Sequence, residues 1–154
     1  MKNRNLEHKD NWATPKDLYD KLNDEFNFDF DPCPLNPGKI PPEKDGLLIE
    51  WGERNFVNPP YSRRLKEAFV MRAVDFQRKG KMSVMLLPVS TSTALFHDWI
   101  LPNADDVRFL RGRVSFEGVN TFGEIVGKGS SPMHDSMVVV FLPNTKEGTA
   151  HKYK

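Results

Sequence analysis

Several sequence features that would indicate a function are absent or rare in this protein. Its one cysteine, Cys33, excludes an internal disulfide and fits a reducing cytoplasm. The net charge is only +1, so any surface that binds nucleic acid must be local. No apolar run is long enough to cross a bilayer, and the polar start lacks the apolar core of a signal peptide. We therefore expect a cytoplasmic protein without a membrane anchor.

Side chains that bind metals or activate nucleophiles are also scarce. The four histidines and Cys33 do not have the spacing of a zinc site, so we expect no metal. No His-Asp or Ser-His pair has a spacing that suggests nucleophilic catalysis. The 154 residues show no repeat and no linker, which predicts one domain. We expect a flexible N-terminus at 1–10, the domain at 11–144 and a polar tail at 145–154.

Hydrophobic periodicity predicts alternating helices and strands. A helix is expected from Pro15 to Phe26 with Thr14 as its N-cap, and further helices at 62–79 and 93–100. Strands are expected at 28–30, 56–57, 82–87, 107–110, 114–116 and 136–142. Residues 117–135 are rich in Gly and Ser and predict a mobile loop. The alternation predicts an α/β fold with a mostly parallel sheet flanked by helices.

The most informative stretch is Asn58-Pro59-Pro60-Tyr61, which follows the apolar, β-prone pair Phe56-Val57. The amine of adenine is a poor nucleophile unless its protons are held by acceptors, here the Asn58 side chain and the Pro59 carbonyl. Consecutive prolines fix φ and make that pair rigid, and Tyr61 offers a flat face for an unstacked base. The carboxyl end of a strand is where open α/β sheets bind ligands. The alternative is an ordinary proline turn.

A methyl donor such as S-adenosylmethionine needs a backbone turn, a carboxylate and an acceptor for its adenine amine. Asp31-Pro32-Cys33 ends a predicted strand and opens a loop, as a donor loop does in a Rossmann-like sheet, although the usual glycine pattern is missing. Asp45 is a candidate acceptor, with a surface Asp-Gly turn as its alternative. Trp12, Thr14 and Pro15 are candidate walls of the donor pocket. Trp12 is equally a hydrophobic staple, and Thr14 a helix cap.

Local positive charge provides candidates for a DNA-binding face. Arg63, Arg64 and Lys66 follow directly on the tetrapeptide and would flank a flipped base, unless they form a solvated helix face. Arg111 and Arg113 bracket a turn at a strand end, which we expect near the same sheet edge.

Several motifs occur in one order along nearly the whole chain, from about residue 11 to residue 143. They are Trp12-x-Thr14-Pro15, Phe28-Asp29-Phe30-Asp31-Pro32-Cys33, Asp45-Gly46-Leu47 with Trp51, Asn58-Pro59-Pro60-Tyr61, Leu86-Leu87-Pro88, Phe109-Leu110-Arg111-Gly112-Arg113-Val114-x-Phe116 and Ser131-Pro132. Together they resemble the phage DNA N-6-adenine methyltransferase family, the small Dam-type enzymes of phages and prophages.

This resemblance implies a compact Rossmann-like class I methyltransferase fold that binds S-adenosylmethionine and double-stranded DNA. It implies methylation of adenine, with Asn58 to Tyr61 as the catalytic motif, and a role in protecting phage DNA from restriction. Asp31, Pro32 and Cys33 would contact the donor, together with Trp12 and Thr14.

Two other functions remain open from the sequence. A methyltransferase with the same tetrapeptide could act on RNA or on a protein glutamine, whose planar amide poses a similar chemical problem. A non-catalytic, nucleic-acid-binding remnant of the fold would lack a usable donor pocket. The oligomeric state and the recognition sequence are not predicted, but the lack of a separate target-recognition domain predicts short or relaxed specificity.

Overall fold

A four-stranded sheet with the strand order β4-β5-β9-β6 forms the centre of the protein. The computed structural model describes residues 4–5, 12–34, 39–114, 116–119, 125–130 and 135–143. The central strands are β4 (Arg54–Val57), β5 (Met82–Pro88), β6 (Asp106–Phe109) and β9 (Ser136–Phe141). The helices are α1 (Lys16–Phe26), α2 (Arg63–Arg78), the π-helix η3 (Leu95–Ile100) and α3 (Leu101–Asn103). The expected α/β fold, with helices flanking a sheet, is confirmed.

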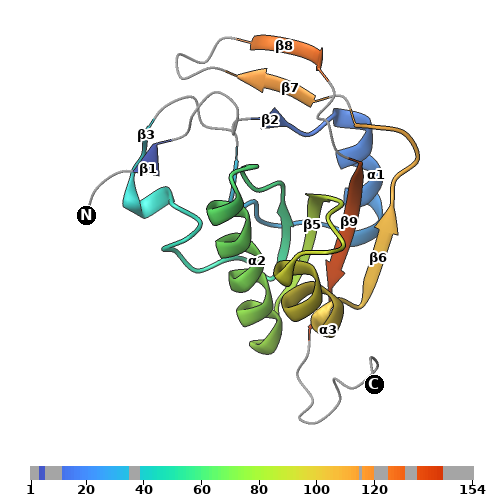
Figure 1. Cartoon of the computed structure of the whole chain (residues 1–154). Helices are drawn as coiled ribbons and strands as arrows, with labels where there is room; N and C mark the ends of the chain where they lie inside the picture. The colour runs from blue at the N-terminus through green and yellow to red at the C-terminus, as the bar shows by residue number, and fades with distance from the viewer. Residues whose placement is uncertain are drawn as a thin grey trace.

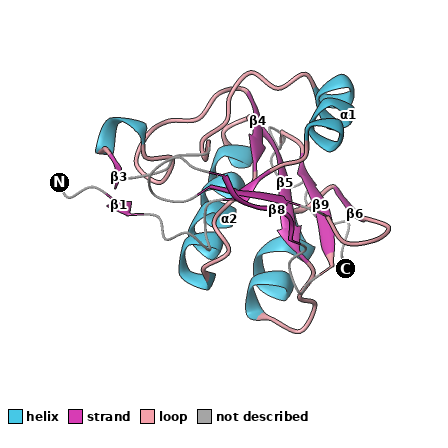
Figure 2. Ribbon diagram, turned by 90° about the horizontal axis from the view of Figure 1, so that it is seen from above, coloured by secondary structure: helices cyan, strands magenta, loops and turns pink. Residues whose placement is uncertain are grey.

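The two faces of the central sheet carry separate apolar clusters, because successive side chains of a strand point to opposite faces. One cluster joins Leu22 and Phe26 of α1 to strand residues that include Phe56 and Val84. The other joins α2 and η3 to strand residues that include Val57, Met85, Leu87, Val139 and Phe141. Figure 2 accordingly shows α1 on one side of the strands and α2 on the other.

The pairing of the strands differs from the mostly parallel sheet that the sequence predicts. β4 pairs with β5 in parallel, whereas β9 pairs antiparallel with both β5 and β6. The prediction is therefore wrong for two of these three pairings. The reversed direction of β9 accounts for both antiparallel pairings, since β4, β5 and β6 all run in the same direction (Figure 1). A parallel neighbour requires a crossover connection, and a β-structure rather than a helix lies between β6 and β9.

That β-structure is a second sheet of β2 (Trp12–Ala13), β7 (Phe116–Val119) and β8 (Ile125–Ser130). All its pairings are antiparallel, and β7 against β8 contains two register shifts. The mobile loop predicted at 117–135 is thus wrong for these strands, because register shifts break the alternation that would reveal them. Residues 120–124 and 131–134 lie outside the described residues. Figure 1 shows this sheet beyond the end toward which β6 points.

Several element boundaries differ from the predictions. The strand expected at 28–30 is reduced to one parallel bridge between Phe30 and Asn55, because the Arg54 carbonyl accepts from both Asp29 and Phe30. The strand expected at 114–116 begins at Phe116 as β7. The third predicted helix, 93–100, begins at Leu95 and is π-helical. Helix α2 is close to its predicted range and ends before Gly80, whose φ is 87°.

A small sheet involves the segment expected to be flexible. Arg4 and Asn5 form β1, which pairs antiparallel with β3 (Lys39–Ile40), and a short 3-10 helix, η2 (Pro42–Lys44), follows. The other residues of the 1–10 segment and the tail from 144 lie outside the described residues. Within the described part of the chain, no helix has the length and apolar character required to span a membrane.

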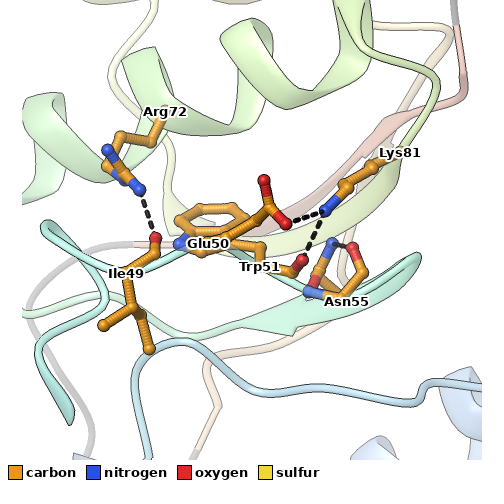
Figure 3. Close-up of polar contacts among 7 residues, drawn as sticks. Ile49, Glu50, Trp51, Asn55, Arg72 and Lys81 are labelled. Carbon is orange, nitrogen blue, oxygen red and sulfur yellow. Dashed lines mark hydrogen bonds and ion pairs between the residues drawn. The ribbon is translucent and has the colours of Figure 1, made fainter. Parts of the chain in front are cut away.

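Polar contacts hold the loop before β4 in place (Figure 3). Lys81 Nζ donates to the Trp51 carbonyl at 2.7 Å, and Arg72 of α2 donates to the Ile49 carbonyl. The buried Asn55 amide donates to a carbonyl of β5 at 2.9 Å. These bonds fix the start of β4, and through it the residues that follow the strand.

Candidate active site

Asn58, the first residue after β4, is hydrogen-bonded to Thr14. Its Nδ2 donates to Thr14 Oγ1 at 3.0 Å, joining residues 44 positions apart in the chain. Thr14 lies between β2 and α1. The prediction that Thr14 caps α1 is wrong, because Pro15 occupies the N-cap and no side chain makes a cap hydrogen bond. A proline has its φ fixed near the value for helix entry and has no N–H to donate, so it suits the position next to the helix.

Asn58 and Thr14 line a pocket of about 200 Å³ together with Asp31 and Cys33. The remaining lining residues are Ala13, Tyr19 and Phe56. The pocket therefore joins the first residue of the predicted catalytic motif to three of the predicted donor contacts. It lies at the carboxyl end of β4, where the sequence predicts a ligand site.

Asp31 supplies the only carboxyl group among the residues that line this described pocket. Its Oδ1 accepts from the Cys33 backbone N–H at 2.8 Å, which closes a tight turn around Pro32. The residue keeps part of its surface exposed, but the protein atoms around the carboxyl displace water and raise its pKa to about 6. Asp31 is therefore ionised at neutral pH and titrates just below it.

The rest of the predicted catalytic tetrapeptide is well packed. Pro59 and Pro60 are buried, and Tyr61 is half-buried against the apolar cluster of α1. Burial raises the pKa of the Tyr61 hydroxyl above its usual range, so the ring is neutral at physiological pH. Tyr61 is not among the residues that line the pocket of Asn58.

Asp45 does not lie in a surface turn, because its loop packs against the Asp31-Pro32 turn. Only 5% of Asp45 is exposed, and its Oδ1 accepts from the Leu47 N–H at 2.9 Å. The carbonyl of Gly46 accepts from Trp51 Nε1 at 2.8 Å. Asp45 is outside the lining of the pocket, as are Pro15 and Pro32. Trp12 pairs through β2 with Gly118, next to the pocket residue Ala13.

A second pocket, of about 300 Å³, lies at the start of α2 and contains two of the predicted DNA-binding cations. Arg63 and Lys66 line it, and Arg63 Nε lies 3.1 Å from Glu67 Oε2. Lys66 is half-buried, and desolvation lowers its pKa. The other lining residues are Glu67, Leu87, Pro88, Ser90, Thr93, Ala94, Leu95, Phe96, Ile100 and Met137. Arg64 is exposed and does not line this pocket.

The turn of Arg111 and Arg113 lies apart from both pockets. Gly112 between them has φ 73°, and both arginines are exposed. Arg113 Nε lies 3.7 Å from Asp135 Oδ1. Because β6 and β4 run in the same direction, this turn and Asn58 both lie at the carboxyl end of the strands. Three strand spacings, roughly 14 Å, separate the two strands.

A family model described as DNA N-6-adenine-methyltransferase (Dam) matches residues 2–153. The chain belongs to this family. The relatives include the DNA N-6-adenine-methyltransferase of Haemophilus phage HP1 (strain HP1c1), which is 34% identical over 151 residues, covering 92% of this chain and 83% of the relative. The DNA N-6-adenine-methyltransferase of Escherichia phage T1 is 27% identical over 162 residues, covering 91% of this chain and 65% of that protein. No solved structure matches the chain significantly.

Membership of the Dam family confirms the resemblance found in the sequence and the enzyme class, an adenine-specific DNA methyltransferase. Within the described residues of this Dam-family chain, no cluster of three or more His, Cys, Asp or Glu side chains could hold a metal ion.

Two aromatic residues of the candidate pocket were not predicted from the sequence as site residues. Tyr19 and Phe56 both line the pocket, and their rings meet edge to face with centroids 5.1 Å apart. For Tyr19, helical spacing contained the necessary signal, since Tyr19, Leu22 and Phe26 recur at i, i+3 and i+7 on the face of α1 that packs on the sheet.

Proposed function

We propose that this protein transfers the methyl group of S-adenosylmethionine to N6 of adenine in double-stranded DNA. The observation that carries the proposal is the pocket shared by Asn58, Thr14 and Asp31 at the carboxyl end of β4, in a chain of the Dam family. A Rossmann-like class I arrangement is part of the proposal. It is supported by three central strands of one direction with helices on both faces.

The chemistry of the pocket lining fits S-adenosylmethionine. The Asp31 carboxylate is an acceptor for the ribose hydroxyls or the amino group, and the rings of Tyr19 and Phe56 provide an apolar wall. At about 200 Å³ the pocket is below the usual range of ligand sites, so it accommodates only part of the donor. Cys33 lines the pocket already, and we assign the remaining contacts to the adjoining loops, with Trp12, Pro15, Pro32 and Asp45 as the candidates.

Direct transfer requires no covalent enzyme intermediate. In the proposed mechanism Asn58 Oδ1 and the Pro59 carbonyl accept hydrogen bonds from the two N–H groups of the adenine amine. The nitrogen then gains tetrahedral character, and its lone pair would form a bond to the methyl carbon as that carbon's bond to the donor sulfur breaks. The donor would leave as a neutral thioether, and N6 would release one proton to solvent to give the neutral methylated base. The buried prolines keep the acceptors rigid, so that most of the rate gain comes from positioning. Stacking on Tyr61 offsets the cost of removing the base from the helix, a few kcal/mol.

DNA is proposed to bind across the carboxyl ends of the central strands. Arg63, Arg64 and Lys66 begin α2 directly after the tetrapeptide, and Arg111 and Arg113 lie at the same end of the strands. Their phosphate contacts would hold the duplex without reading its sequence. Such methylation would act in the cytoplasm of a host cell and protect phage or prophage DNA from restriction.

Transfer of a labelled methyl group from S-adenosylmethionine to DNA, RNA or protein tests the acceptor. We expect label in DNA, and specifically in N6-methyladenine. Label in RNA or in protein glutamine with none in DNA would contradict the proposal. Calorimetric titration with S-adenosylmethionine tests the donor, since a non-catalytic remnant would show no binding.

A further inference from the structure

We propose that the pocket of about 300 Å³ at the start of α2 binds the thymine that loses its partner when the target adenine leaves the duplex. The inference rests on the proposed function, because this thymine becomes unpaired only if the enzyme extrudes a paired adenine. Opening one A·T pair frees two bases, and the proposed site at Asn58 receives only the adenine. The partner of adenine is thymine in every sequence context, so the pocket has to accept one kind of base.

This pocket lies on the opposite face of the central sheet from the pocket of Asn58. Its lining residues Leu87 and Met137 belong to the apolar cluster of α2 and η3. The pocket of Asn58 contains Phe56 and Tyr19, which belong to the cluster of α1 or pack against it. The two pockets lie at the carboxyl ends of β4 and β5, which are parallel neighbours with a spacing of about 4.8 Å. The two bases of one opened pair can therefore diverge at this end of the sheet.

The floor of the pocket suits the methyl-bearing ring of thymine. The buried apolar side chains that line it include Leu87, Leu95, Phe96 and Met137. Phe109 pairs directly with Met137 across β6 and β9, so its side chain leaves the sheet on the same face, beside the pocket. Its ring is 63% exposed and offers an aromatic surface on which a base can stack. Apolar contact with the C5-methyl group is a contact that only thymine, among the four DNA bases, provides.

The rim of the pocket supplies polar groups that complement a thymine nucleotide. Arg63, Lys66 and Glu67 share one face of α2, since they are three and four residues apart. The two cations suit the phosphates beside the base, and an anion near Lys66 would oppose the desolvation that lowers its pKa. Glu67 Oε2 accepts from Arg63 Nε at 3.1 Å, which orients the carboxylate and offsets its charge. The base-pairing edge of thymine has one donor, N3–H, for which a carboxylate is the matching acceptor.

Photocrosslinking with the wild-type full chain locates the unpaired thymine. The methylated positions in genomic DNA are first mapped by sequencing, and duplexes with one mapped site then carry 5-iodouracil opposite the target adenine. Its iodine takes the place of the thymine methyl group, so we expect a crosslink to a peptide that contains Phe96 or Met137. 5-Iodouracil farther along the same strand is the control, for which we expect no crosslink to these peptides. Crosslinks confined to other parts of the protein, or no crosslink, would overturn the inference.

A comparison of two duplexes tests the contact with Glu67. The Kd of the wild type and of Glu67→Ala is measured for a duplex with thymine opposite the target adenine and for one with an abasic residue there. We expect Glu67→Ala to weaken binding about tenfold more for the thymine duplex, as for the loss of a hydrogen bond to a charged group. Arg64→Gln changes an exposed cation that does not line the pocket, so it should weaken binding to both duplexes alike.

Equal losses for Glu67→Ala on the two duplexes would overturn the inference. Normal methylation of genomic DNA by the wild type would then leave the proposed function standing. No methylation of genomic DNA by the wild type would overturn both.

Discussion

Gly46 lies directly against Pro32. A β-carbon built on Gly46 would be 1.9 Å from the Pro32 carbonyl oxygen and 3.0 Å from the ring of Phe69. Real β-carbons do not approach backbone oxygens this closely, so only glycine permits the contact. The contact packs the Asp45-Gly46 loop on the turn that presents Asp31 to the pocket. The glycine of this motif is therefore required for close approach rather than for a turn alone.

Gly46→Ala should consequently displace the Asp31-Pro32 turn. The obstructing atom is backbone, so we expect unfolding to become easier by about 2 kcal/mol or more, as for an overpacked core. Binding of S-adenosylmethionine should weaken at the same time. Urea unfolding and calorimetric titration measure the two effects. Leu48→Ala, which truncates an exposed side chain of the same loop, is the control and should change neither by much. If Gly46→Ala had the wild-type free energy of unfolding and the wild-type affinity for S-adenosylmethionine, the close contact would be absent.

The affinity for S-adenosylmethionine should depend on pH through Asp31. Its pKa of about 6 means that the accepting carboxylate is protonated as the pH falls from 7 to 5, so the Kd should rise over that range. Calorimetric titrations at several pH values measure this rise. In Asp31→Asn the affinity should be weaker at neutral pH and its dependence on pH flatter. A wild-type profile that persists in Asp31→Asn would exclude Asp31 as the titrating group.

Asp31 should also lower the stability of the folded protein at neutral pH. Its folded pKa lies above its ordinary value of 3.8, so the folded state holds the proton more firmly than the unfolded chain. The cost is therefore fully present above about pH 6 and disappears as the pH falls toward the ordinary value. Asp31→Asn should raise Tm by a few degrees at pH 7.5, with the difference shrinking at pH 4.5. A lower Tm for the variant at pH 7.5 would contradict this expectation.

Lys66 should contribute to DNA affinity through one phosphate contact. In Lys66→Gln, binding to duplex DNA should weaken for all sequences alike, and the slope of log K against log salt should fall by about 0.9. Arg78→Gln removes a cation from the last turn of the same helix and is the matched control, for which we expect little change. Fluorescence anisotropy across a salt series measures the slopes. Equal slopes for the Lys66 variant and the wild type would remove Lys66 from the interface.

Asn55 should be a major determinant of stability. Its Nδ2 donates to the carbonyls of Gly52 and Met82, and its Oδ1 accepts from the Gly52 N–H, each at 2.9 Å. Asn55→Ala leaves the buried Met82 carbonyl and the partly buried Gly52 groups unpaired, so we expect a loss of about 3 kcal/mol in urea unfolding. Asn103→Ala, which removes a single bond to the Trp99 carbonyl, should cost about 1 kcal/mol. Similar losses for the two variants would contradict this assignment.

The elements with strong hydrophobic patterns were predictable from the sequence. The continuous apolar runs of β5 and β9 are buried, and the helical stripe with Leu22 and Phe26 packs on the sheet. Local cues also located the pocket, because Asn58 follows a β-prone pair and Asp31 precedes a proline.

Other features depend on tertiary structure and leave little local trace. The direction of β9 follows from its connection through the second sheet, and the register shifts between β7 and β8 hide their strand pattern. Capping propensity favoured Thr14 as a helix cap, whereas the fold uses its hydroxyl for Asn58, which lies 44 residues away.

The central claim is that the protein methylates adenine in DNA and that Asn58 is a catalytic residue of this reaction. The most direct measurement is mass spectrometry of nucleosides from the DNA of cells that express the protein, compared with cells that express equal amounts of folded Asn58→Ala. We predict N6-methyladenine in cells with the wild-type protein, in a host that lacks its own adenine methylation, and only background in cells with Asn58→Ala. Equal N6-methyladenine from the two proteins, or none from the wild type, would contradict the account.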